Sequence, residues 1–291
     1  MRIENKKALV ASLTLAVVAM FWGTSYAIVK DVLNDIKPFQ LMTLRFGFST
    51  LILSCIFFKK LKKITKKDIC QGSIIGIFLF FAFLFLVIGI LYTTASKQSF
   101  IVGAYVILVP FLAWVINKRP LDRYELTGAA VATIGIGLLT LDNSFSINKG
   151  DGISILCSIS FACHMITIEY FSKESDPIIS TIIQFAITAV FFILLTGIFE
   201  SYSIKLDGKM IKATTYLVIM TTVIPFLVQN IAQQYISSTS TALIFTLESA
   251  FGGIFAVSFL GEEMSTRMIV GAIIIFLGII TEETKWKFFK R

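Results

Sequence analysis

Residues 96–116 read SKQSFIVGAYVILVPFLAWVI, and residues 239–259 read TSTALIFTLESAFGGIFAVSF. Each stretch is mostly apolar and about as long as the roughly 20-residue α-helix that crosses the hydrocarbon core of a bilayer. A shift of 143 residues places the first stretch on the second, and the alignment continues without a gap into the residues that follow. These two stretches therefore predict a membrane protein that contains an internal repeat.

The same kind of apolar run recurs along the whole chain. Of the 291 residues, 56% are apolar and 15% are charged, and a soluble domain has too little interior to bury so much apolar surface. The connections between the runs are short, which leaves no room for a separate soluble domain. We predict an all-α membrane protein with ten transmembrane helices, at about 8–29, 38–58, 69–91, 96–116, 122–141, 151–171, 177–198, 212–233, 238–259 and 265–283.

Basic residues in the short connections predict the orientation of these helices. With the N-terminus inside, 17 Lys and Arg residues lie in inner segments and 8 lie in outer segments. This bias predicts a bacterial inner-membrane protein with both termini in the cytoplasm, which also requires an even number of spans. Topology explains the net charge of +8, so we expect the lipid bilayer, and no nucleic acid, as a partner.

Small residues mark the repeat most clearly in the fifth and tenth runs. Under the 143-residue shift, Gly128-Ala129 aligns with Gly271-Ala272, and Gly135-Ile136 aligns with Gly278-Ile279. The identities are sparse, but they are collinear over about 45 residues.

The repeat divides the chain into two halves of five helices each, 1–146 and 147–291. Because five is an odd number, the second half is predicted to run through the membrane inverted relative to the first. Inverted repeats are typical of transporters, since a pseudo-two-fold axis in the membrane plane permits two related packings that open to opposite sides. The alternative is an ancient duplication in a membrane protein that transports nothing.

Two titratable residues lie inside predicted spans. Glu248 is near the middle of the ninth run, where a charged side chain costs about 2.5–3.5 kcal/mol on insertion scales. It is expected to face an interior cavity and to bind substrate or a proton; the alternative is a permanently protonated hydrogen-bonding residue. His164, the single histidine, is a second candidate for proton coupling because imidazole titrates near neutral pH. The alternative is that His164 is a buried core residue whose ring nitrogens are hydrogen-bonded within the protein.

Polar and aromatic side chains within other spans complete the predicted substrate site. Trp22 and Tyr26 lie four residues apart in the first run, Thr222 and Gln229 share one side of the eighth run, and Tyr105 is the repeat partner of Glu248. An aromatic stripe is also common in packing and in interface belts. We nevertheless expect these residues to line a substrate cavity together with Glu248.

Two further residues carry more specific expectations. Pro225 cannot donate a backbone hydrogen bond, so it frees a carbonyl within its helix for use by a pore. Arg45 lies about two turns into the second run, and we expect it to extend outward to the membrane surface or to pair with a carboxylate.

Motifs for other chemistry are missing from the sequence. There is no Walker motif, no GxSxG and no HExxH, so the chain is not expected to be an enzyme. The four cysteines form no CxxC pair, and one histidine cannot supply a metal or haem site alone. We therefore expect no cofactor and no metal.

Several motifs occur in an order that resembles a known family over nearly the whole chain. They are Phe21-Trp22-Gly23-Thr24-Ser25-Tyr26-Ala27, Leu44-Arg45-Phe46, FIVGAYVILVP at 100–110, Leu247-Glu248-Ser249-Ala250-Phe251, Leu260-Gly261-Glu262-Glu263, Gly271-Ala272 and Gly278. This ordered set resembles the EamA type of the drug/metabolite transporter superfamily. The resemblance implies a five-plus-five inverted arrangement, with a cavity lined by spans one, three, four, six, eight and nine and with spans five and ten at the periphery.

The sequence departs from this family's pattern at two places. Ser249 stands where many second halves carry Pro after the mid-span Glu, which predicts a weaker bend there. Arg119-Pro120 in the first half corresponds to Glu262-Glu263 in the second, which predicts that the halves are not functionally equivalent.

The family resemblance implies a secondary transporter that exports amino acids or related small metabolites by alternating access, with proton coupling as a further expectation. The partners are then a small-molecule substrate, the bilayer and protons, in a monomer or homodimer. Two alternatives stay open: a lipid or lysolipid flippase on the same scaffold, and a membrane interaction protein without transport activity.

Overall fold

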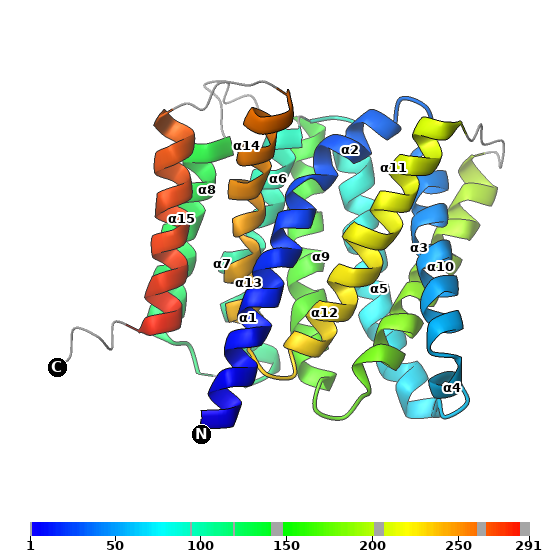
Figure 1. The fold of residues 1–291 in the computed structure, drawn as a ribbon, viewed down its shortest axis with the longest axis horizontal. Coiled ribbons are helices and arrows are strands. Elements are labelled where there is room, and N and C mark those ends of the chain that lie inside the picture. The colour runs from blue at the N-terminus through cyan, green and yellow to red at the C-terminus, as the bar shows by residue number, and fades with distance from the viewer. Residues whose placement is uncertain are drawn as a thin grey trace.

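The computed structural model describes residues 2–93, 95–118, 120–140, 148–200, 207–260 and 266–285, and within these ranges the chain is helical without strands. Figure 1 shows the helices as a bundle. In chain order they are α1 (Arg2–Gly23), α2 (Ser25–Val32), α3 (Pro38–Ile56), α4 (Phe58–Leu61), α5 (Lys66–Gly89), α6 (Ala95–Gly103), α7 (Tyr105–Ile116), α8 (Arg123–Thr140), α9 (Lys149–Phe171), α10 (Pro177–Phe199), α11 (Gly208–Val218), the π-helix η1 (Ile219–Val223), α12 (Ile224–Ala232), α13 (Ser238–Phe245), α14 (Leu247–Leu260) and α15 (Thr266–Thr284).

Several helix starts follow directly from the sequence. Pro38 and Pro177 occupy the first position of α3 and α10, where a missing N–H costs no hydrogen bond. Thr65 and Asn148 cap α5 and α9 through capping boxes, in which the cap and the third helical residue bond to each other's backbone.

Seven helical segments of the described residues are long and apolar enough to cross a membrane. They are Lys6–Val32, Pro38–Ile56, Lys66–Gly89, Gln98–Ile116, Lys149–Phe171, Pro177–Phe199 and Gly208–Ala232. A shorter apolar segment occupies Ile269–Glu282. The multi-span all-α prediction is thus confirmed, while the total of ten helices and their five-plus-five division stay predictions.

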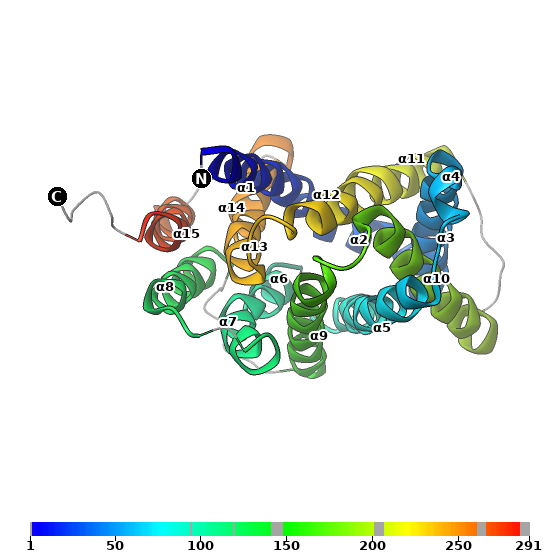
Figure 2. The ribbon, with the colours of Figure 1, turned by 90° about the horizontal axis from the view of Figure 1, so that it is seen from below.

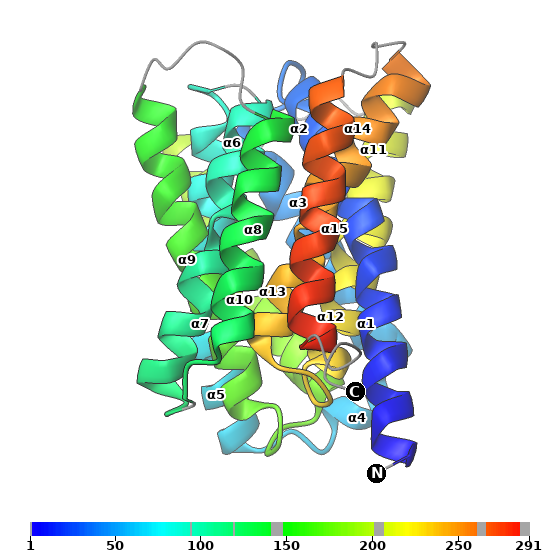
Figure 3. The same ribbon diagram turned by 90° about the vertical axis from the view of Figure 1, so that its left-hand side faces the viewer.

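The contact between α8 and α15 is reciprocal in the way that a two-fold axis between the two helices requires. A Cβ added to Gly128 would lie 2.8 Å from the Gly278 carbonyl oxygen, and one added to Gly135 would lie 2.7 Å from that of Gly271. Under the 143-residue shift, Gly128 corresponds to Gly271 and Gly135 corresponds to Gly278. Gly128 therefore contacts the repeat equivalent of Gly135, and Gly135 contacts the repeat equivalent of Gly128. The two helices run antiparallel at one end of the bundle, as Figures 2 and 3 show.

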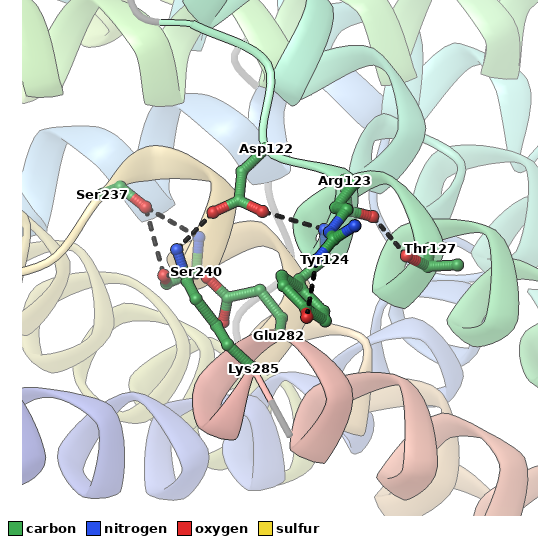
Figure 4. Close-up of polar contacts among 8 residues, drawn as sticks. All are labelled: Asp122, Arg123, Tyr124, Thr127, Ser237, Ser240, Glu282 and Lys285. Carbon is green, nitrogen blue, oxygen red and sulfur yellow. Dashed lines mark hydrogen bonds and ion pairs between the residues drawn. The ribbon is translucent and has the colours of Figure 1, made fainter. Parts of the chain in front are cut away.

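The face on which α1 begins and α15 ends, at the bottom of Figure 1, is called the lower face here. Figure 4 shows a polar cluster on it that ties α8, α13 and α15 together. Lys285 pairs with Asp122 just before α8, and Ser240 Oγ lies 2.7 Å from Glu282 Oε1. These contacts hold the start of α13 against the end of α15.

Helix interruptions occur at related places in the two halves. One lies at Ala104 between α6 and α7, and another at Thr246 between α13 and α14. Ala104 corresponds to Leu247 under the repeat shift, so the interruptions differ by a single position. The second one forms although Ser249 replaces proline. The predicted boundary at 146/147, Arg119 and Glu262-Glu263 lie outside the described residues.

Candidate functional site

A narrow cavity lies in the interior of the bundle, where most of the long helices meet. Its volume is about 40 Å³, which has room for a few water molecules and is far below the roughly 300–1,000 Å³ of typical small-molecule sites. It is lined by Trp22, Ser25, Tyr26, Val29, Arg45, Phe83, Leu86, Val102, Tyr105, Phe161, Met165, Phe226 and Glu248.

Four of the predicted site residues share this lining: Trp22, Tyr26, Tyr105 and Glu248. They come from α1, α2, α7 and α14, and each lies within two residues of a helix interruption. Spans one, three, four, six, eight and nine, which the family resemblance predicts to line the cavity, all contribute lining residues. Helix α3 contributes one more, Arg45. No described side chain of α8 or α15 is among the lining residues, in agreement with the place of these helices at one end of the bundle (Figure 2).

Close packing of α1 on α14 brings Trp22 and Glu248 to the same cavity. A Cβ on Gly23 would lie 2.8 Å from the Glu248 carbonyl oxygen and 2.8 Å from the Gly252 nitrogen. Glycine at position 23 therefore allows the backbones to approach, as small residues do at membrane helix contacts. The Trp22 ring then packs against Phe245 at a centroid distance of 4.6 Å.

The Glu248 carboxyl faces the cavity without a direct partner. No hydrogen bond or ion pair joins it to another residue in the described ranges, although Tyr26 and Tyr105 line the same space. A carboxylate removed from water without a counter-ion is costly. The side chain is therefore available to a proton or to a cationic group that enters the cavity.

Arg45 corrects one sequence-based expectation. Its side chain neither extends to the membrane surface nor pairs with a carboxylate of the described chain; it is 2% exposed and lines the cavity. It donates from Nε to Thr222 Oγ1 and from Nη2 to the Thr221 carbonyl oxygen at 3.0 Å. Its guanidinium carbon also lies 4.7 Å from the centre of the Phe83 ring. Tertiary packing, not the distance to the interface, decides where this arginine points.

Pro225 frees a carbonyl, as expected, and the cavity wall uses it. Proline has no N–H to donate to the carbonyl oxygen of the residue four positions earlier, which here is Thr221. The Thr221 carbonyl oxygen instead accepts from Trp22 Nε1 at 2.9 Å and from Arg45 Nη2. The π-helix η1 places both Thr221 and Thr222 toward Arg45, consistent with the frequent occurrence of π-bulges at functional sites.

Three predicted site residues lie outside the cavity lining. Thr222 is fully buried and reaches the site only through Arg45. Gln229 donates to Gln233 Oε1 at 3.1 Å, and His164 Nε2 lies 2.8 Å from Gln184 Oε1. The structure thus places Gln229 and His164 in hydrogen-bonded pairs behind the wall of the cavity.

Polar contacts join helices on both sides of the cavity. On the lower side, Gln233 Nε2 donates to the carbonyl oxygen of the lining residue Met165 at 2.9 Å. Further down, the Ser238 backbone N–H donates to Glu169 Oε2 at 3.0 Å. On the upper side, Lys30 Nζ donates to the Thr93 carbonyl oxygen at 3.0 Å. These bonds join different helices above and below the cavity.

In the described part of the chain, no group of three or more His, Cys, Asp or Glu side chains is placed so that it could hold a metal ion. The cavity instead combines one guanidinium, one carboxyl, two tyrosine hydroxyls and an apolar wall. Such a set suits reversible binding of a small organic molecule.

Comparisons with known proteins identify the family. The model of the EamA-like transporter family matches twice, over residues 9–141 and 148–281. An uncharacterized transporter of Archaeoglobus fulgidus is 30% identical, over 95% of this chain and 87% of its own length. A probable amino-acid metabolite efflux pump of Salmonella typhimurium is 23% identical, over 90% of this chain and 91% of its own length.

The fold has a solved counterpart. One crystal structure superposes with a TM-score of 0.80 at 14% identity, covering 97% of this chain and 99% of the other. At that identity the likeness shows a shared fold alone. The two family matches together cover most of the sequence, and the chain therefore belongs to the EamA-like transporter family of the drug/metabolite transporter superfamily.

Proposed function

We propose that this transporter exports amino acids or related small metabolites across the cytoplasmic membrane by alternating access. The observation that carries the proposal is the interior cavity, in which Glu248 has no described hydrogen-bond or ion-pair partner. Trp22, Tyr26, Tyr105 and Glu248 form the substrate site in this proposal. The relative named as an amino-acid metabolite efflux pump supports the choice of cargo.

Alternating access requires that the contacts on each side of the cavity break in turn. Breaking the bond between Ser238 and Glu169 would open the lower side, and breaking the bond between Lys30 and Thr93 would open the upper side. The lysines between 59 and 67 lie at the lower face, so the positive-inside rule assigns this face to the cytoplasm.

Proton coupling is assigned to Glu248. A carboxyl in a low-dielectric cavity binds a proton when the cavity is otherwise empty, and it can release that proton when a cationic group takes its place. His164 is a weaker candidate, because Gln184 occupies its Nε2 and it lies outside the lining.

Flux into proteoliposomes tests the proposal. With an imposed pH gradient, the wild type should move amino acids faster than protein-free vesicles, and Glu248→Gln should abolish the pH dependence. Asp35→Asn serves as the control, because Asp35 is an exposed carboxyl three residues beyond the end of α2 and is not among the cavity lining residues. Full, pH-dependent transport by Glu248→Gln would show that the coupling assignment is wrong.

A further inference from the structure

Arg45 is a buried cation whose counter-ion is missing from the described chain. It is 2% exposed, and no carboxylate of the described ranges pairs with it. An isolated charge in an apolar interior is strongly unfavourable unless something compensates it. Hydrogen bonds to Thr221 and Thr222 compensate in part, but they are neutral acceptors.

The geometry of the guanidinium leaves one corner open. Thr221 and Thr222 occupy Nε and both N–H groups of Nη2, at 3.0 and 2.9 Å for the two Thr221 acceptors. The face of the group lies on the Phe83 ring. Nη1 makes no hydrogen bond to any described residue, while Arg45 lines the cavity. Two charged N–H donors are thus held in a fixed orientation beside an open space.

The same cavity contains a group of the opposite character. Glu248 also lines it and also lacks a described partner. Arg45 and Glu248 come from α3 and α14, so they approach the cavity from different helices. The rest of the lining is mainly apolar and includes Leu86, Val102 and Phe226. A ligand that satisfies both polar groups and this wall carries one anionic end, one cationic end and an apolar side chain.

We propose that Arg45 binds the carboxylate of the substrate, and that the cavity, once it widens beyond its volume of about 40 Å³, selects α-amino acids with an apolar side chain. This inference rests on the transport function proposed above and names its substrate class. The carboxylate accepts from Nη1 of Arg45, and the ammonium group donates to the carboxylate of Glu248. Thr221 and Thr222 are positioning residues, which hold the guanidinium so that its free corner faces the cavity.

The π-helix explains why arginine, and not lysine, suits this position. A guanidinium can bond to η1 with one edge and still offer further donors in the same plane, whereas an ammonium group is a single point of charge on a flexible stem. Arg45 can therefore stay bound to Thr221 and Thr222 while its remaining donors bind a ligand. Arg45→Lys keeps the charge, but a lysine cannot bond to Thr221 and Thr222 and still offer a second set of donors to the ligand.

Competition in wild-type proteoliposomes tests the proposal without any mutation. Counterflow of radiolabelled L-leucine is measured against unlabelled L-leucine, L-leucinamide and N-acetyl-L-leucine, and uptake of labelled leucinamide is measured in parallel. We expect leucinamide, which lacks the carboxylate, to compete at least tenfold more weakly than leucine. N-acetyl-leucine, which lacks the ammonium group, should also compete about tenfold more weakly than leucine. Leucinamide that competes as well as leucine would overturn the assignment of Arg45.

Variants separate ligand binding from a purely structural role of Arg45. Arg45→Lys should raise the KM for leucine at least tenfold and reduce the preference for leucine over leucinamide. Arg123→Lys is the matched control, because Arg123 is an exposed arginine beside Tyr124 at the lower face. An Arg45→Lys protein that keeps the wild-type preference would assign Arg45 a structural role only. If this variant does not fold, the wild-type competition alone decides.

Failure of the underlying function looks different from failure of this inference. If the wild type transports neither leucine nor leucinamide, and no other member of an amino-acid panel, then the proposed export function falls and this inference falls with it. If leucinamide is transported as well as leucine, transport stands and only the role of Arg45 is overturned.

Discussion

The packing of α8 on α15 predicts a large effect from a single methyl group. In Gly135→Ala the new Cβ would lie 2.7 Å from the Gly271 carbonyl oxygen and 2.8 Å from the Ile275 nitrogen. Ordinary contact begins at 3.4 Å, so the helices would have to separate by about 0.7 Å at this point. The opposing atoms are backbone and cannot rotate away. Overpacking of this kind costs about 1–3 kcal/mol.

The matched control is Gly47→Ala in α3, because a Cβ at that position meets nothing within 4 Å. Alanine is preferred over glycine in a helix by about 1 kcal/mol, so this variant should be neutral or slightly stabilised. Thermal unfolding of both purified variants in detergent gives the comparison. An unfolding midpoint for Gly135→Ala equal to or above that of Gly47→Ala would refute the close reciprocal contact of α8 and α15.

Two further predictions concern the cavity wall and the lower face. Trp22→Phe removes the bond to Thr221 but keeps an aromatic ring, so it should cost about 0.5–1.5 kcal/mol in thermal unfolding; a loss as large as that of Trp22→Ala would contradict this. Burial opposes ionisation of Asp176, but bonds from Lys60 and from the backbone at the start of α10 outweigh it, and the pKa of Asp176 lies below its ordinary 3.8. Its stabilising contribution is therefore present above about pH 4 and lost as pH falls through that lowered pKa. Asp176→Asn keeps the cap and should weaken this acid sensitivity, and an unchanged pH profile of unfolding would argue against it.

Much of the fold could be predicted because a bilayer imposes simple length and polarity rules. The apolar runs predicted the long helices within a few residues, and Pro38 and Pro177 marked two helix starts. The repeat aligned Gly128 with Gly271 and Gly135 with Gly278, and the structure adds that these glycines lie where α8 and α15 pack together. These features depend on composition and spacing, which a sequence displays directly.

Part of the site could be predicted for the same reason. Trp22, Tyr26, Tyr105 and Glu248 are polar or aromatic residues within apolar runs, and one cavity brings them together. Arg45 was expected elsewhere because its direction depends on the partners that α5 and η1 provide.

The π-helix bears on the two differences in the eighth run, at Thr222 and Gln229. It inserts extra backbone into the helical turn at Ile219–Val223, which changes the faces on which later residues of the eighth run lie. Thr222 therefore reaches the site only through Arg45, and Gln229 lies behind the wall. Pro225 was the one visible signal of this irregularity, since it predicted the free carbonyl that Trp22 and Arg45 use.

The central claim is that one cavity opens alternately to the two sides of the membrane. Ser25 lines this cavity and is small, so Ser25→Cys places a thiol in it after the four native cysteines are replaced. A membrane-impermeant thiol reagent is then applied from either side of oriented vesicles in which the variant still transports. The account predicts labelling from both sides, slowed by substrate. Labelling from one side alone, or from neither, would contradict it.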